Sequence, residues 1–212
     1  MRGDTIPAKQ IGQAKACLRR HLLARRAALT SAEIDHKSAA IAAYVCALPV
    51  FEASRTLMVY LSLPQEVQTA VVIEEARRLQ KRIVVPAVTE RGLVAVECPA
   101  DAAQLRRSPL GILEPCEVSA PVPPAEIDCV LVPGLGFDCR GTRLGFGKGY
   151  YDRFLSQLSA AACFGGIAFH TQIIPCVPCR PHDVSMLFVV TEQGVLTWSH
   201  VLPASQGAPH AG

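Results

Sequence analysis

Four glycines lie close to an arginine, a lysine and an aspartate, Arg143, Lys148 and Asp152, in the segment RGTRLGFGKGYYDRF, residues 140–154. The glycines are Gly141, Gly145, Gly147 and Gly149. Glycine lets backbone N–H groups approach a ligand without interference from a Cβ, and it tolerates positive φ. Successive amides near the start of a helix favour phosphate, and Arg143 and Lys148 add positive charge. The segment therefore favours phosphate binding, with a plain flexible turn as the alternative that spacing alone leaves open.

Two common nucleotide-binding motifs do not match this spacing. A Walker loop needs Ser or Thr after its Gly-Lys pair, where this chain has Gly149, and an earlier glycine where it has Thr142. The dinucleotide-binding fingerprint would need glycine at the position of Tyr150. Both motifs are excluded, so the phosphate-binding hypothesis depends on the composition of the segment and its place in the fold.

Composition limits the class of protein. The chain has 212 residues, enough for one sizeable core, and half of them are apolar while 18% are charged, which is typical of a globular domain. A net charge of +3 does not suggest nucleic-acid binding and suits a small anionic ligand. We find neither a signal-peptide pattern nor an apolar run of membrane-spanning length. Nine cysteines, among them Cys46, Cys129 and Cys163 in apolar segments, predict reduced, buried thiols and a cytoplasmic protein.

Hydrophobic periodicity predicts strands that alternate with helices. The expected helices cover residues 8–29, 30–48, 70–79 and 149–160. The expected strands cover residues 55–63, 82–88, 93–97, 129–135, 163–169 and 187–191. Thr30 and Glu33 form a capping box that opens the second helix, Pro49 ends it, and Thr69 caps the third.

This order of elements is typical of an α/β fold with a largely parallel sheet flanked by helices. We expect a single domain over residues 1–201 and a mobile tail over 202–212. The glycine-rich segment follows an apolar strand and enters a helix, which places it where ligands bind in such folds, at the carboxyl ends of the strands.

A longer segment, VPGLGFDCRGTRLGFGKGYYDRFL, resembles the signature of the 5-formyltetrahydrofolate cyclo-ligase (5,10-methenyltetrahydrofolate synthetase) family. Further matches follow in the family's order and span about residues 15–195. They are Lys15 with Arg19, EVQT at 66–69, GILEP at 111–115, PHDV at 181–184 and TE at 191–192. The resemblance implies an α/β sandwich related to the sugar-phosphate isomerase and CoA-transferase folds.

The resemblance also implies an activity, the ATP- and Mg2+-dependent ring closure of 5-formyltetrahydrofolate to 5,10-methenyltetrahydrofolate with release of ADP and phosphate. In this reaction ATP phosphorylates the formyl oxygen, which is otherwise a poor leaving group, and nitrogen 10 then closes the ring. Phosphoryl transfer depends on positioning and on charge neutralisation. The expected partners are therefore small molecules, a reduced folate and ATP, with neither nucleic acid nor membrane, and we slightly favour a monomer.

The residues implied for ATP are basic side chains of the first helix and the glycine-rich segment. Lys15 and Arg19 lie four residues apart, on one helical face; without the resemblance, the ordinary interpretation is a solvated basic face. The predicted catalytic residues are Arg143, Lys148 and Tyr151. The predicted ATP-binding residues are Lys15, Arg19, Arg143, Leu144, Gly145, Phe146, Gly147, Lys148, Gly149, Tyr150 and Tyr151.

Two aspartates are implied as the magnesium ligands, Asp152 and Asp183, since Mg2+ takes one or two carboxylates together with phosphate oxygens and water. The alternative for Asp152 is a helix residue paired with Arg153. The alternative for Asp183 is an ordinary turn-forming residue. Glu66 is implied as the acidic folate contact, with Tyr151 packed against the folate.

Several neighbouring assignments are less specific. Tyr150 could equally belong to the core, and residues 133–137 would border the adenine. The family usually has acidic residues where this chain has Gln68 and Leu187, which points to an effect on affinity or packing. The CVPC segment at 176–179, with His170 and His182 nearby, could indicate zinc or redox chemistry. Its prolines, Pro175, Pro178 and Pro181, predict an irregular loop instead.

Two other classes of function compete with a cyclo-ligase. One is an enzyme of the same fold that uses ATP on another small N-formyl compound. The other is a folate- or nucleotide-binding relative that has lost turnover. The retained basic residues, glycines and aspartates argue against the second, and Glu66 argues for a pterin.

Overall fold

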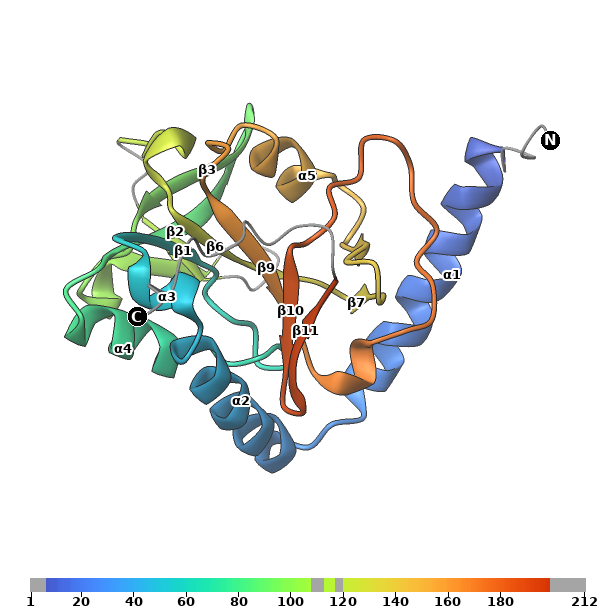
Figure 1. Ribbon diagram of the computed structural model, residues 1–212, viewed down its shortest axis with the longest axis horizontal. Helices are drawn as coiled ribbons and strands as arrows, with labels where there is room; N and C mark the ends of the chain where they lie inside the picture. Colours follow the sequence, from blue (N-terminus) through green and yellow to red (C-terminus); the bar gives the residue numbers. More distant parts are fainter. Residues whose placement is uncertain (1–6, 108–112, 117–119, 199–212) are drawn as a thin grey trace, which may run out of the picture.

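The computed structural model describes residues 7–107, 113–116 and 120–198. Its centre is a seven-stranded sheet in the order β11-β10-β9-β6-β1-β2-β3 (Figure 1). The five inner strands pair in parallel, and β3 and β11 pair antiparallel at the two edges. The strands are β1 (Thr56–Val59), β2 (Arg82–Thr89), β3 (Gly92–Glu97), β6 (Cys129–Pro133), β9 (Cys163–Ile167), β10 (Phe188–Thr191) and β11 (Gly194–Thr197). The predicted α/β fold with a largely parallel sheet is confirmed.

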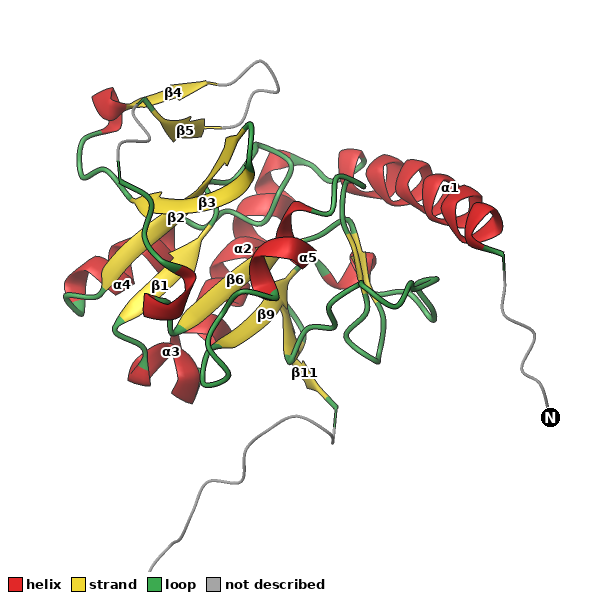
Figure 2. Ribbon diagram, turned by 90° about the horizontal axis from the view of Figure 1, so that it is seen from above, coloured by secondary structure: helices red, strands yellow, loops and turns green. Residues whose placement is uncertain are grey.

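Helices cover both faces of this sheet (Figure 2). The helices are α1 (Ala8–Ala27), α2 (Ser31–Cys46), α3 (Pro49–Ala53), α4 (Ala70–Arg78) and α5 (Tyr150–Leu155). Leu57 and Val59 of β1 pack in one cluster with residues of α2, α3 and α4, whereas Met58 packs in a second cluster with α5. Because both faces are buried, the strands β1, β6 and β10 are largely apolar and do not alternate with exposed residues.

Two small sheets and three 3-10 turns complete the described chain. The strands β4 (Leu105–Arg107) and β5 (Leu113–Pro115) form one hairpin, and β7 (Gly136–Phe137) pairs with β8 (Arg143–Leu144). The 3-10 turns are η1 (Ala102–Gln104), η2 (Pro124–Glu126) and η3 (His170–Gln172). The expected tail at 202–212 lies outside the described residues.

The start of α2 follows the predicted capping box. The Thr30 hydroxyl accepts from the Glu33 N–H at 3.3 Å, and the Glu33 carboxylate accepts from the Thr30 N–H at 2.8 Å. Such a cap stabilises a helix by about 1 kcal/mol. Pro49 does not simply end this helix, since α2 ends at Cys46 and Pro49 opens the short helix α3, where proline is favoured at the first position.

Other expected boundaries differ for local reasons. Thr69 precedes α4 as predicted but does not cap it, because its hydroxyl donates to the Tyr60 carbonyl at 2.7 Å. The chain thus leaves the sheet after Val59, and the expected strand 55–63 is shortened to four residues. The helix α5 ends at Leu155, five residues before its expected end. Beyond it the chain forms turns, and the N–H of residue 157 donates to the Phe154 carbonyl three residues back.

All nine cysteines lie within the described ranges and are free thiols. Of the three expected to be buried, only Cys129 is, while Cys46 and Cys163 are half-buried. Burial raises the pKa of Cys129 to about 12, which leaves this thiol unreactive. Among the described helices, none combines the length and the apolar composition that a membrane crossing requires.

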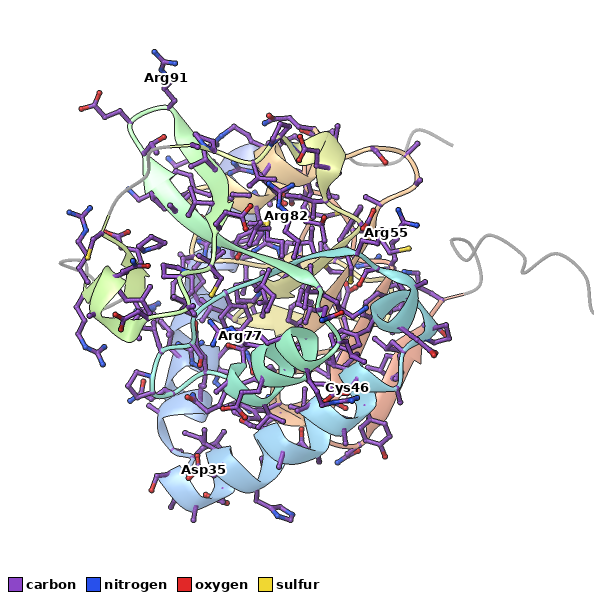
Figure 3. The ribbon with its side chains drawn as sticks, turned by 90° about the vertical axis from the view of Figure 1, so that its left-hand side faces the viewer. Asp35, Cys46, Arg55, Arg77, Arg82 and Arg91 are labelled. Atoms are coloured by element: carbon purple, nitrogen blue, oxygen red, sulfur yellow. The ribbon has the colours of Figure 1, made fainter. Side chains whose placement is uncertain are left out.

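A group of arginines lies on the side of the molecule formed by α4 and the β2–β3 hairpin (Figure 3). Arg82 pairs with Glu97 at 2.7 Å and with Glu126 at 2.5 Å, and Arg77 donates to the Pro99 carbonyl at 2.9 Å. Both ion pairs of Arg82 are exposed and contribute about 0–1 kcal/mol each. The charge of Arg82 is therefore balanced by two carboxylates on a solvated surface.

Candidate active site

The helix α1 lies beside the segment that precedes β10, and both adjoin loops from the carboxyl ends of parallel strands (Figure 1). Lys15 pairs with Asp183 of that segment. Arg19 donates through Nε to the Gly145 carbonyl at 2.8 Å, in the loop that follows β8. The helix therefore joins two of the segments in which the sequence predicts site residues.

One stripe of α1 carries these contacts, since Lys15, Arg19, Leu22 and Arg26 recur at helical spacing. Lys15 is 8% exposed and Arg26 is 5% exposed, on the same side as the buried Leu22. Buried cations are unfavourable unless they are paired, and each has a carboxylate partner. The alternative of a solvated basic face is therefore wrong for Lys15, while Arg26 is a buried cation that the sequence analysis did not single out.

Positive charge is concentrated at the Lys15 end of this stripe. Burial lowers the pKa of Arg19, and the charge of nearby Arg180 lowers it further. The Arg180 N–H donates to the Asp183 carboxylate at 2.7 Å. Lys15 pairs with that carboxylate, while Arg19 lies near both the carboxylate and the Arg180 side chain. Positive charge is therefore in excess here, which suits a polyanion such as a triphosphate.

Arg143, at the start of β8, is held rigidly. Arg143 as a whole is 8% exposed, and its guanidinium pairs with the Asp152 carboxylate at 3.0 Å and donates to the Pro133 carbonyl at 3.4 Å. It also lies over the Tyr151 ring, 5.3 Å from the ring centroid. Three partners fix its position, so little side-chain entropy remains to be lost when an anion binds.

The loop 145–149 packs its glycines against two arginines. A Cβ on Gly145 would lie 2.6 Å from Nη1 of Arg143, and one on Gly147 would lie 3.2 Å from the Arg19 guanidinium. Gly147 also has φ of 102°, which favours glycine. Between them, Phe146 is exposed, as is Lys148. The loop thus combines open backbone with adjacent cations, as the phosphate-binding hypothesis requires.

Other predicted ATP residues contribute packing. The Leu144 side chain is fully buried in a cluster with Leu22, so only its backbone faces the loop. Tyr150 lies beside Arg153, whose guanidinium is 5.5 Å from its ring centroid, and Tyr151 packs against the core cluster that contains α5. The predicted contacts of these three residues with ATP stay predictions.

The two candidate magnesium ligands come from neighbouring segments. The N–H of Val184, next to Asp183 in sequence, donates to the Asp152 carboxylate at 3.2 Å. Burial alone would raise the pKa of Asp183, but hydrogen bonds from Lys15 and from the Arg180 backbone outweigh it and lower this pKa. Asp152 pairs with Arg143 and not with Arg153. The alternative that Asp152 is a helix residue paired with Arg153 is therefore wrong.

These carboxylates fit magnesium better than zinc. Within residues 7–107, 113–116 and 120–198, no three His, Cys, Asp or Glu side chains gather closely enough to hold a metal ion. The zinc interpretation of Cys176, Cys179 and the nearby histidines therefore has no support, and their segment is the irregular loop that its prolines predict. Two carboxylates suffice for Mg2+, which keeps water and phosphate oxygens as its remaining ligands.

Glu66 lies in the loop after β1 and is 8% exposed. Its carboxylate pairs with Arg26 at 3.3 Å and accepts from the Leu63 N–H at 3.2 Å. Burial raises the pKa of Glu66, and the charge of Arg26 opposes this effect. Glu66 and Arg26 line a cavity of about 10 Å³ together with Tyr60 and Gln172.

Comparisons with known proteins identify the family of the chain. A model of the 5-formyltetrahydrofolate cyclo-ligase family matches residues 11–192. The chain belongs to this family. It is 29% identical to the 5-formyltetrahydrofolate cyclo-ligase of Mus musculus over 198 residues, which cover 88% of this chain and 98% of the mouse protein.

Solved structures of cyclo-ligase relatives share the fold. The NMR structure of Aquifex aeolicus 5,10-methenyltetrahydrofolate synthetase superposes with a TM-score of 0.73 at 31% identity, covering 91% of this chain and 97% of that one. The 5,10-methenyltetrahydrofolate synthetase of Mycoplasma pneumoniae superposes with a TM-score of 0.69 at 28% identity, covering 84% and 98%.

Three polar residues support the cyclo-ligase site without having been expected to. Asp138 is 1% exposed and accepts from the N–H groups of Arg140 at 2.9 Å, Thr142 at 3.0 Å and Val177 at 2.9 Å. It thereby fixes the turn that leads into Arg143. An aspartate followed by a nearby glycine is typical of such a turn and was the available signal.

Gln172 and Gln68 each hold a loop of the site. Gln172 donates to the Gly134 carbonyl at 2.7 Å, in the segment expected to border adenine. Gln68, one of the two departures from the family pattern, donates to the carbonyls of Leu63 at 2.9 Å and Glu66 at 2.7 Å. The second departure, Leu187, packs against the core. In this chain both departures serve packing.

Proposed function

We propose that this protein is an ATP- and Mg2+-dependent cyclo-ligase that converts 5-formyltetrahydrofolate to 5,10-methenyltetrahydrofolate, releasing ADP and phosphate. The observation that carries the proposal is the meeting of Lys15 and Arg19 of α1 with the glycine loop and with Asp183. The family to which the chain belongs is named for this reaction. The site supplies cations, open backbone and paired carboxylates, which are the parts that phosphoryl transfer needs.

The basic residues neutralise the triphosphate in this proposal. Lys15 and Arg19 bind phosphate from α1, while Arg143 and Lys148 bind it from the glycine loop together with the N–H groups of residues 145–149. Arg143 is already fixed by Asp152, so it presents its charge without reorganising as the γ-phosphate moves to the formyl oxygen. Lys148 is exposed and contributes once the nucleotide is in place.

Asp152 and Asp183 are the proposed ligands of Mg2+. The metal ion, when bound, neutralises charge on the phosphate oxygens and orients them for in-line transfer. The carboxylates themselves hold the proposed site together, because Asp152 accepts from the Val184 N–H beside Asp183. Lys15 stays within reach of the same phosphates through its contact with Asp183.

Glu66 and Tyr151 are the proposed folate contacts. The Glu66 carboxylate is an acceptor for the N–H groups of the pterin, and the Tyr151 ring offers an apolar surface beside Arg143. Attack of nitrogen 10 on the activated formyl carbon forms the C–N bond and breaks the C–O bond. The phosphate departs with the former formyl oxygen and takes up the proton lost from nitrogen 10. In this proposal Arg143 binds the transferred phosphoryl group and lies over the Tyr151 ring that packs against the folate.

The test is a direct assay with (6S)-5-formyltetrahydrofolate and Mg-ATP, in which near-ultraviolet absorbance follows the methenyl product. We expect the absorbance to rise only when both ATP and Mg2+ are present, and to stop rising when EDTA is added. A flat trace from folded protein would overturn the proposal. Melting shifts with ATP and with the folate would then separate a binding protein from an enzyme acting on another formyl compound.

The cell compartment and the oligomeric state stay predictions. We expect a cytoplasmic enzyme that is active as a monomer, with small molecules as its partners. Size-exclusion chromatography with light scattering gives the mass in solution. A dimer whose activity falls on dilution would contradict the expectation of a monomer.

A further inference from the structure

Arg26 is a buried cation in the last turn of α1 that the proposed chemistry does not yet use. Its side chain is 6% exposed, and its Nη1 pairs with the Glu66 carboxylate at 3.3 Å. The Phe146 ring of the glycine loop lies beside it, with its centroid 5.9 Å from the guanidinium carbon. Its buried Nε has no hydrogen-bond partner among the described residues. The guanidinium therefore keeps an unused donor beside the cavity it shares with Glu66.

Stability alone does not account for this pair. A buried ion pair is often no more stable than apolar residues of the same volume, because the cost of removing both charges from water offsets their attraction. An unmatched buried donor adds about 1–3 kcal/mol of further cost. The buried ion pair and the unmatched Nε donor both lie in the wall of one cavity. Binding of a ligand explains this combination better than packing does.

The groups that face Glu66 identify what Arg26 does there. They are Arg26 from α1, Tyr60 from the end of β1 and Tyr151 from α5. Burial raises the pKa of both phenols above their ordinary value, so they stay neutral near physiological pH. Arg26 is the cation that opposes the effect of burial on Glu66. Without it, we expect Glu66 to hold a proton to higher pH and to lose its value as an acceptor of two hydrogen bonds.

We propose that Arg26 is a positioning residue of the folate site, which holds Glu66 as a carboxylate ready to accept the pterin N–H groups. The inference rests on the proposed function, since it assigns Glu66 to the pterin. The unused Nε donor complements this role, because a pterin presents a carbonyl acceptor next to its N–H donors. The cavity of about 10 Å³ has room for about one water molecule, so the ring must lie at its mouth or displace its side chains.

Folate binding by Arg26→Met tests the proposal. Calorimetry measures the dissociation constant of (6S)-5-formyltetrahydrofolate without ATP, from about pH 6.5 to 8.5. We expect Arg26→Met to bind about 10-fold or more weakly at the acid end, the loss of a hydrogen bond to a charged group, and to recover toward wild type as the pH rises. Binding in two buffers of different ionisation enthalpy should show proton release by this variant and almost none by wild type.

Four further variants isolate the role of Arg26. Arg25→Met removes the adjacent, exposed arginine of the same helix and should bind like wild type at every pH. Arg26→Lys keeps the charge and should restore most of the affinity. Arg26→Gln also removes the charge and replaces Arg26→Met if that variant does not fold. The double variant Arg26→Met/Glu66→Gln should bind weakly with no dependence on pH, because the titrating carboxyl is gone.

Two outcomes would overturn the inference. One is wild-type affinity in Arg26→Met across the whole pH range. The other is a loss of equal size at every pH without proton release, which would mean that Arg26 only maintains structure. Failure of the proposed function looks different, because wild-type protein itself would then form no methenyl product from the folate and Mg-ATP.

Discussion

The guanidinium of Arg143 and the carboxylate of Asp152 form an ion pair of 3.0 Å that connects the two ends of the glycine loop. The side chains are 6% and 17% exposed. Before any ligand binds, the positive charge of Arg143 and the negative charge of Asp152 compensate each other. A magnesium–nucleotide complex carries both signs of charge, so it supplies a new partner to the arginine and to the aspartate at once. The pair thus keeps the site folded and ready for the ligand proposed for it.

Arg143→Ala should reduce turnover much more than it reduces stability. It removes a fixed cation from the proposed phosphate site, and loss of one such group slows phosphoryl or acyl transfer by about 10²–10³-fold. The backbone of β8 and the N–H donor from Val184 to Asp152 remain, so the fold should persist. The measurements are kcat with saturating Mg-ATP and the melting temperature. Arg153→Ala, an exposed arginine of the same helix as Asp152, is the matched control and should keep kcat within about threefold.

Gly145→Ala should act through Arg143. The added methyl would lie 2.6 Å from Nη1 of Arg143, so the guanidinium must move away from Asp152. We expect kcat to fall by about 10-fold or more, since a displacement of this size misplaces a charge-stabilising group. The Arg143→Ala/Gly145→Ala double variant should be no slower than Arg143→Ala alone. Simple multiplication of the two effects would show that Gly145 acts on something other than Arg143.

Asp152→Asn should raise the magnesium requirement. An amide keeps the size of the side chain and can still meet the Val184 N–H, but it removes the charge that attracts the metal. The Mg2+ concentration for half-maximal activity should rise about 10-fold or more, while a large excess of Mg2+ restores part of kcat.

The matched control for that variant is Asp35→Asn, an exposed aspartate on α2, in view in Figure 3. Its magnesium titration should coincide with that of wild type. An Asp152→Asn titration that also coincides with wild type would remove Asp152 from the metal site and leave it with its structural contacts alone.

How far the sequence predicts this molecule depends on the range of the interactions involved. The strand-and-helix order, the capping box of Thr30 and the glycine loop follow from local patterns, and these the structure confirms. The shortening of β1 does not follow from a local pattern. It depends on the Thr69 hydroxyl, nine residues further along the chain, which donates to the Tyr60 carbonyl. The edge strand β11 was also missed, since it has only four residues and none of them is buried, which leaves little hydrophobic signal in the sequence.

The same distinction applies to the site. The resemblance pointed to Lys15 and Asp183, and the structure joins them although 168 residues separate them in the chain. Arg26 was not singled out because the helix carries several basic residues, and the sequence alone does not show which of them is buried. Its burial depends on how α1 packs against the loop that carries Glu66, which no spacing along the helix reveals. Asp138 was missed for the same reason, as its partner at Val177 is remote in sequence.

Asp138 makes the stability of the protein depend on pH in a defined direction. Burial alone would raise its pKa, but its hydrogen bonds with Val177, Arg140 and Thr142 outweigh this effect and lower the pKa below its usual value. The folded protein therefore binds this proton more weakly than the unfolded chain does. The resulting stabilisation is fully present above about pH 4, the ordinary pKa of aspartate, and is lost as the pH falls through the lowered value.

Asp138→Asn should thus destabilise the protein by about 1–3 kcal/mol at neutral pH, since one buried N–H group loses its charged acceptor. The difference from wild type should shrink as the pH is lowered below about 4, because wild type then loses the charge that the variant lacks. Urea unfolding at a series of pH values measures it, with Asp35→Asn expected within about 0.5 kcal/mol of wild type at neutral pH. A difference that stays constant down to the acid limit would mean that the two acceptor oxygens matter at position 138, and that the negative charge does not.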